Sequence, residues 1–159
     1  MIVYFLRHGP AGSRAEWDGP DRLRPLTDDG RRTVARAADV LSRAGVVVNA
    51  IVTSPLTRAR ETAEIVAPAL CIEDPRLIDD ERLAHGFDRG ALADIIAEHP
   101  EARAVMVVGH EPEFSGTIGE VTGGAVVMKK AGVARVDLDP VTMRGELVWL
   151  LAPRILTNL

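Results

Sequence analysis

Cysteine, lysine and long apolar runs are all scarce in this chain. The single cysteine, Cys71, excludes an intramolecular disulfide framework, and its apolar neighbours predict a buried, inert thiol. No apolar run approaches the roughly 18 residues of a membrane span, and the N-terminus enters a strand-like segment without the pattern of a secretory leader. These absences predict a cytoplasmic protein without a membrane partner.

A continuous basic stripe is missing as well. The formal net charge is −4, and the basic residues are dispersed among acidic ones, which argues against a nucleic-acid partner. Most of the positive charge is carried by arginine, whose guanidinium group matches the oxygens of phosphate, so arginines at the ends of strands and helices are candidates for phosphate recognition. The length of 159 residues fits one domain, residues 1–159, with a core of its own.

Apolar segments of strand and helix type alternate over the first two thirds of the chain. Thr27, Ser54 and Asp88 are expected to cap helices, the second with Pro55 as its first residue, and a short helix is expected over 114–121. Strands are expected at 2–6, 46–53, 70–72, 104–108, 126–128, 134–138 and 147–151. This order predicts an α/β fold, a three-layer α/β/α sandwich with a mainly parallel sheet and an antiparallel edge.

Polar side chains follow three of the expected strands at the point where each strand ends. Arg7 and His8 follow the first, Ser54 and Arg58 follow the second, and His110 follows the fourth apolar run. The carboxyl ends of parallel strands meet at one edge of the sheet, where ligands bind in open α/β folds. Two arginines and two imidazoles beside a helix N-terminus suit a dianionic tetrahedral group, which favours a phosphoryl group over a carboxylate.

Four ordered motifs resemble those of the histidine phosphatase superfamily, with its phosphoglycerate mutase-like fold, and in particular of its small SixA-type phosphohistidine phosphatases. The motifs are Leu6-Arg7-His8-Gly9, Arg24-Pro25-Leu26-Thr27 with Gly30, the segment 53–62, and Val108-Gly109-His110-Glu111-Pro112. Together they span most of the chain. The resemblance implies a nucleophilic role for His8 and phosphate-pocket roles for Arg7, Arg58 and His110.

The implied reaction passes through a phosphohistidine on His8. The attacking nitrogen must be neutral, and a reference pKa near 6.5, lowered further by the adjacent cation of Arg7, makes that form accessible at neutral pH. Arg7, Arg58 and a protonated His110 would stabilise the charge on the phosphoryl oxygens. Phosphoryl transfer then requires no metal ion and no other cofactor.

The motifs leave the proton donor to the leaving group open. Glu81, in a segment that resembles a mutase loop, is one candidate, and His85 and Glu111 are the others. A phosphoramidate needs a less well-placed acid, because the departing imidazole can itself carry a proton. Arg24 and Ser54, together with His85 and Glu111, are expected to contact the substrate.

The chain has little material for a lid over the pocket. Neither the segment 75–88 nor the C-terminal tail is long enough to enclose it, so a side chain of another protein could enter. This openness agrees with the preferred substrate that the resemblance implies, a phosphohistidine-bearing protein such as a phosphotransfer domain. The alternatives are a phosphatase acting on a small phosphomonoester and, in a different class, a phosphoprotein-binding module without turnover.

Overall fold

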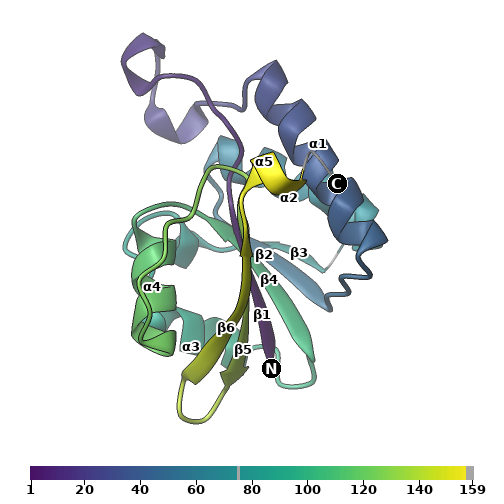
Figure 1. Ribbon diagram of the computed structural model, residues 1–159. Helices are drawn as coiled ribbons and strands as arrows, with labels where there is room; N and C mark the ends of the chain where they lie inside the picture. Colours follow the sequence, from purple (N-terminus) through teal and green to yellow (C-terminus); the bar gives the residue numbers. More distant parts are fainter. Residues whose placement is uncertain (75, 157–159) are drawn as a thin grey trace.

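The computed structural model describes residues 1–74 and 76–156, and its centre is one six-stranded sheet. The strands are β1 (Ile2–Arg7), β2 (Ala50–Thr53), β3 (Leu77–Asp79), β4 (Ala104–Gly109), β5 (Val133–Asp139) and β6 (Arg144–Leu151), in the order β3-β2-β4-β1-β5-β6. The first four are parallel to one another, β5 pairs antiparallel with β1, and β6 pairs antiparallel with β5. The expected mainly parallel sheet with an antiparallel edge is confirmed (Figure 1).

Helices cover both faces of this sheet. They are α1 (Asp28–Arg43), α2 (Thr57–Ala69), α3 (Arg89–Ala97), α4 (Glu113–Thr122) and α5 (Pro153–Leu156), with short 3₁₀ helices η1 (Arg14–Glu16), η2 (Asp21–Leu23) and η3 (Glu81–Leu83). The helices α1 and α2 pack on one face and α3 and α4 on the other, which confirms the three-layer sandwich (Figure 1). Within the described part of the chain, no helix has both the length and the apolar character needed to cross a membrane.

The first strand shows how the sequence specifies the two cores. Tyr4 and Leu6 are buried in the layer of α1 and α2, while Val3 and Phe5 are buried in the layer of α3 and α4. Successive side chains of a strand point to opposite faces, so a strand covered on both sides must be apolar throughout. The change to arginine and histidine after Leu6 therefore marks the point where the chain leaves the core.

Two of the three expected helix caps are confirmed. The Thr27 hydroxyl accepts a hydrogen bond from the Gly30 amide at 2.9 Å, and the Asp88 carboxylate accepts one from the Ala91 amide at 2.9 Å. The helix expected to begin at Ser54 starts later, at Thr57. In the preceding turn the Ser54 hydroxyl accepts a hydrogen bond from the Leu56 amide at 3.2 Å.

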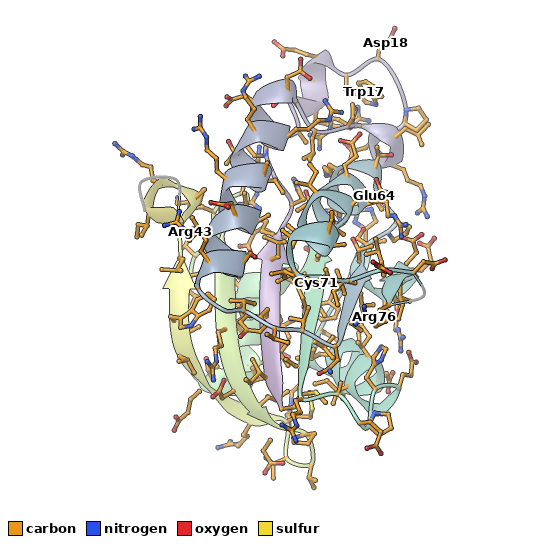
Figure 2. All side chains as sticks on the ribbon, turned by 90° about the vertical axis from the view of Figure 1, so that its right-hand side faces the viewer. Trp17, Asp18, Arg43, Glu64, Cys71 and Arg76 are labelled. Atoms are coloured by element: carbon orange, nitrogen blue, oxygen red, sulfur yellow. The ribbon has the colours of Figure 1, made fainter. Side chains whose placement is uncertain are left out.

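The expected strand at 70–72 and the expected burial of Cys71 are wrong. α2 ends at Ala69 with Leu70 as its C-cap, and Cys71 has a φ of 57°, a left-handed conformation that turns the chain. Leu70 and Ile72 are buried against the layer of α1 and α2, whereas Cys71 is exposed (Figure 2). The apolar pattern reflects burial of the turn against the helices, and the sheet takes its edge strand from β3 instead.

The run at 126–128 is likewise not a strand. It lies in the connection between α4 and β5, where Met128 is fully buried. The Met128 carbonyl oxygen accepts a hydrogen bond from Arg7 at 2.7 Å. Its apolar character therefore anchors the connection next to the end of β1.

Candidate active site

The register of the sheet places the two histidines side by side. Arg7 pairs with Gly109 where β1 and β4 run parallel, so His8 and His110 follow at equivalent positions, and the His8 amide donates to the Gly109 carbonyl at 3.0 Å. Ser54 follows β2 at the same edge. The imidazole centroids of His8 and His110 are 5.1 Å apart.

A cavity of about 410 Å³ opens at this edge. Its walls come from the end of β1, the loop between β1 and α1, the first turn of α2, the loop after η3, the loop before α4 with the first residue of α4, and the loop before β5. They comprise Arg7, His8, Gly12, Ser13, Arg14, Arg24, Arg58, His85, His110, Glu111, Glu113 and Lys130. A larger hollow of about 640 Å³ lies beside Met1, Pro100 and Asp139, and no histidine lines it. Position at the carboxyl ends of parallel strands, rather than volume, therefore identifies the candidate site.

His8 is buried with one ring nitrogen engaged by the backbone. Its Nδ1 lies 2.7 Å from the Gly9 carbonyl oxygen, so Nδ1 carries the proton and Nε2 presents a lone pair in the neutral tautomer. Burial, and after it the positive charges of Arg58, Arg7 and Lys130, lower the pKa of His8 to about 3, although the Gly9 hydrogen bond acts in the opposite direction. The ring is therefore neutral at pH 7, with the Nε2 lone pair available.

Arg7 is held by the connection before β5. One guanidinium nitrogen donates to the Met128 carbonyl, and the Ala131 amide donates to the carbonyl oxygens of Arg7 and His8 at 3.1 and 3.0 Å. These bonds also bring Lys130 to the cavity wall, where burial, followed by the charges of nearby arginines, lowers its pKa. The buried Nε of Arg7 has no hydrogen-bond partner among the described residues.

Arg58, from the first turn of α2, is fixed by a carboxylate from the loop after β1. Its guanidinium donates to the Asp21 carbonyl at 2.9 Å and lies 3.2 Å from an Asp21 carboxylate oxygen. The same carboxylate pairs with Arg24 at 2.9 Å and Arg14 at 3.3 Å. Within the described part of the chain the Arg58 Nε, like that of Arg7, is buried without a partner, which leaves a donor for an anion.

His110 is held by Ser54. The Ser54 hydroxyl lies 2.8 Å from His110 Nε2, while the buried Nδ1 has no partner among residues 1–74 and 76–156. Burial first, and then the charges of His8 and Arg58, lower the pKa of His110 to about 3. In the protein alone the His110 ring is therefore neutral at pH 7, whereas a protonated ring was expected. The cause is that two imidazoles and two guanidinium groups share one buried space.

The predicted substrate contacts occupy different places around the cavity. Arg24, His85 and Glu111 line it, whereas Ser54 is buried behind His110. Arg24 Nη1 donates to two carbonyl oxygens of the loop after β1, at 2.8 and 3.0 Å, so it also fixes that loop.

The three candidate acids differ in whether they line the cavity and in the contacts that they already make. Glu81 forms an ion pair with Arg22, its side chain is 70% exposed, and it is not among the residues that line the cavity. The His85 ring stacks on His110 with centroids 6.4 Å apart. Glu111 lines the cavity, but both of its carboxylate oxygens accept hydrogen bonds from the first turn of α4.

Motif reasoning did not include four charged residues at the cavity. Arg14, Glu113 and Lys130 line it, and Asp21 fixes the arginines. Some signal was present in the sequence, because Lys130 belongs to the single lysine pair of an arginine-rich chain and Asp21 stands three residues before Arg24. Their side chains reach the cavity only through tertiary contacts of the loops that carry them.

Among residues 1–74 and 76–156, no three histidine, cysteine, aspartate or glutamate side chains are grouped closely enough to hold a metal ion. The cavity instead combines arginine and lysine donors with two neutral imidazoles. Such an arrangement can bind a tetrahedral oxyanion and attack it with a ring nitrogen.

Comparisons with known proteins agree with this chemistry. The model of the histidine phosphatase superfamily (branch 1) matches residues 3–84. Phosphohistidine phosphatase SixA of Escherichia coli is 26% identical over 157 residues, covering 96% of this chain and 94% of that protein. An uncharacterized protein of Picosynechococcus sp. is 36% identical over 143 residues, covering 84% of this chain and 82% of that one.

The fold agrees as well. A solved structure of the protein histidine phosphatase SixA complexed with tungstate superimposes with a TM-score of 0.87 at 25% identity, covering 97% of this chain and 98% of that one. Similarity over nearly the full length supports phosphatase activity. The family match, the fold and the arrangement of His8, His110 and the arginines lead to one conclusion: the chain belongs to the histidine phosphatase superfamily, branch 1.

Proposed function

We propose that the protein hydrolyses phosphohistidine on another protein through a covalent phospho-His8 intermediate. The observation that carries this proposal is the fixed neutral tautomer of His8, with Nδ1 held by Gly9 and Nε2 available for attack. A neutral imidazole beside two guanidinium groups is the state that a histidine nucleophile requires.

In the first step, His8 Nε2 attacks phosphorus and the bond to the leaving group breaks. Arg7 and Arg58 hold the phosphoryl oxygens, and their unpartnered Nε donors provide hydrogen bonds that strengthen as charge develops. Phosphoryl transfer depends mainly on such positioning and charge stabilisation. Water then attacks phospho-His8, which releases phosphate and restores the neutral imidazole.

His110 acquires its charge from the substrate in this proposal. A bound phosphoryl dianion favours the imidazolium form, which reverses the effect of the surrounding arginines. The Nδ1 position, buried and without a partner among the described residues, then donates to the phosphoryl group while Ser54 holds Nε2. Because His8 and His110 share one space, their titrations are coupled.

The open cavity and the similarity to SixA support a protein substrate. Among the described residues, the segment after α2 forms β3 and η3 and contributes His85 to the cavity wall, while α5 contacts α1, so no lid is formed by these parts. A small phosphomonoester is the alternative substrate class, since the cavity also admits one. We further propose that the reaction needs no metal ion and that the protein works in the cytoplasm, in line with the single cysteine.

Rapid-quench trapping with a phosphorylated phosphotransfer domain tests the intermediate. We expect an acid-labile, base-stable phosphoenzyme in the wild type, none in His8→Ala, and normal labelling in His99→Ala, whose histidine lies outside the cavity. Tight binding of the phosphorylated domain without label or turnover would instead establish a binding module.

The substrate class is tested by comparing kcat/KM for that phosphorylated domain with kcat/KM for a panel of small phosphomonoesters. We expect the protein substrate to be faster by at least tenfold. An ester turned over orders of magnitude faster would replace the protein substrate with a metabolite.

A further inference from the structure

One carboxylate in the cavity wall has an oxygen that accepts no hydrogen bond from the described residues. Glu113 begins α4 and lines the cavity. Its Oε1 accepts a hydrogen bond from the Gly86 amide at 3.4 Å, whereas Oε2 is buried and has no hydrogen-bond partner among the described residues. A buried acceptor without a donor is energetically unfavourable. This oxygen can therefore accept a hydrogen bond from an N–H or O–H group of a ligand.

The other carboxylates near the site are already occupied. Glu111 accepts from the Ser115 amide at 3.0 Å and from the Ser115 hydroxyl at 2.7 Å. Asp21 is surrounded by arginines, and Glu81 is paired with Arg22 outside the cavity. Glu113 is therefore the carboxylate in the cavity wall that can offer a free acceptor to a ligand.

The surroundings of Glu113 place it on the imidazole side of the cavity. Gly86, which donates to it, directly follows His85, and the His85 ring stacks on the His110 ring with an angle of 26° between the planes. Most other charged groups in the wall are cations that suit phosphoryl oxygens. A carboxylate would repel those oxygens, so its place among them favours contact with a cationic part of the substrate.

We infer that Glu113 receives the leaving group, accepting the N–H of the phosphorylated imidazole on the ring nitrogen that carries no phosphorus. This inference rests on the proposed function and names the residue that selects phosphoramidates over phosphomonoesters. Protonation of that nitrogen makes the substrate ring cationic, and a carboxylate contact stabilises this form. His8 Nε2 bonds to phosphorus, the phosphorus–nitrogen bond breaks, and its electron pair remains on the departing nitrogen.

The proton balance of this step requires no acid. The imidazole leaves as a neutral ring that keeps the proton held by Glu113, and Glu113 remains a carboxylate throughout. A phosphomonoester, in contrast, leaves as an oxyanion, which needs a proton donor and is repelled by a carboxylate. One side chain thus favours the nitrogen leaving group and disfavours the oxygen leaving group.

The test compares Glu113→Gln, Glu113→Ala and the control Glu120→Gln, which removes the same charge from an exposed position of α4. The substrates are free N-phosphohistidine and p-nitrophenyl phosphate, whose leaving group needs no acid. For Glu113→Gln we expect kcat/KM to fall at least tenfold on phosphohistidine and to stay within twofold, or rise, on the ester. Loss of the contact also shifts the alkaline limb of the phosphohistidine profile to lower pH by about 1 unit. The control should match the wild type on both substrates.

Each outcome has one meaning. Equal losses on the two substrates, or an unchanged rate on phosphohistidine, would overturn the role of Glu113 and leave the proposed function standing. A wild type that cleaves esters but not phosphohistidine would overturn both. Retained activity on the ester shows that a variant is folded. Because Glu113→Ala removes the charge without introducing an amide, it shows whether the effect of Glu113→Gln comes from loss of charge or from packing of the glutamine side chain.

Discussion

At the scale of single residues, Asp21 joins three arginines of the site. Its carboxylate lies 2.9, 3.2 and 3.3 Å from the guanidinium groups of Arg24, Arg58 and Arg14, and these pairs hold its pKa below the ordinary value despite the opposing effect of burial. Asp21 touches no phosphoryl oxygen in the proposed reaction. It is a positioning residue, because it determines where Arg58 points.

Replacing Asp21 with asparagine should therefore lower kcat without raising KM. We expect kcat to fall on the order of tenfold, because Arg58 loses its fixed orientation at the reacting centre. The KM should not rise, because removing a negative charge from beside the cavity favours an anionic substrate. Steady-state kinetics with p-nitrophenyl phosphate measures both constants.

Asp18 provides the matched control, since it lies in the same loop at its exposed outer tip (Figure 2). Asp18→Asn should leave both constants unchanged. A rise in KM without a change in kcat for Asp21→Asn would mean that Asp21 acts on substrate binding and not on the position of Arg58.

At the scale of elements, the start of α1 and the chain after His8 are in direct backbone contact. The Thr27 amide donates to the Pro10 carbonyl at 3.0 Å, and a Cβ on Gly30 would lie 2.0 Å from the same oxygen. The Pro10 carbonyl thus rests on the first turn of α1, which fixes the segment that leaves the nucleophile. Only a residue without a side chain permits this approach.

Gly30→Ala should consequently destabilise the fold. We expect the free energy of unfolding to fall by about 1–3 kcal/mol, because the added carbon forces the loop away from α1. Urea denaturation measures this change. Gly116→Ala in α4 is the control, because its Cβ would have no atom within 4 Å and alanine favours a helix by up to about 1 kcal/mol. Equal stability of the two variants would contradict the close-contact argument.

The elements also show what sequence can and cannot predict. Caps at Thr27 and Asp88 were predictable because a side chain bonds to an amide three residues away, so all partners are local. The turn at Cys71 was not, because an apolar run has the same pattern in a strand and in a turn buried against helices. The positive φ of Cys71, which distinguishes the turn from a strand, could not be predicted from its residue type.

In the candidate site, too, residues placed by local sequence patterns were predictable, and residues placed by tertiary contacts were not. Arg7, His8 and His110 were predictable as neighbours because they end strands, and parallel strands align their ends. Lys130 and Glu113 were not, because Lys130 depends on a connection held by the Ala131 amide on the Arg7 carbonyl, and Glu113 meets the Gly86 amide only in the folded chain. Local sequence does not encode such partners, which lie 27 positions away for Glu113 and more than a hundred for the Ala131 amide.

At the scale of the whole molecule, the buried histidines couple stability to pH. In the folded protein the pKa of each of His8 and His110 is lowered to about 3, mainly by burial, whereas in the unfolded chain each takes up a proton near pH 6.5. As pH falls from 6.5 toward 3, the unfolded state binds more protons than the folded state. The free energy of unfolding should therefore decrease over this window, by up to about 1.4 kcal/mol per pH unit for each histidine.

Urea unfolding at pH 7 and pH 5 measures this effect. His8→Asn should show a smaller decrease than the wild type, because one of the two buried imidazoles is gone, and the double variant with His110→Asn should show a smaller one still. Equal stability of the wild type at the two pH values would show that the histidines are not held neutral by the fold.

The position of β1 in the middle of the sheet has a consequence for how the protein is made. β1 is translated before both of its neighbours in the sheet, because β4 and β5 begin only at residues 104 and 133. Until those strands leave the ribosome, β1 has two unpaired edges and apolar side chains on both faces, a combination that invites aggregation. We therefore expect β1 to need shielding until β5 has been translated, and the cavity at its carboxyl end can form only after that point.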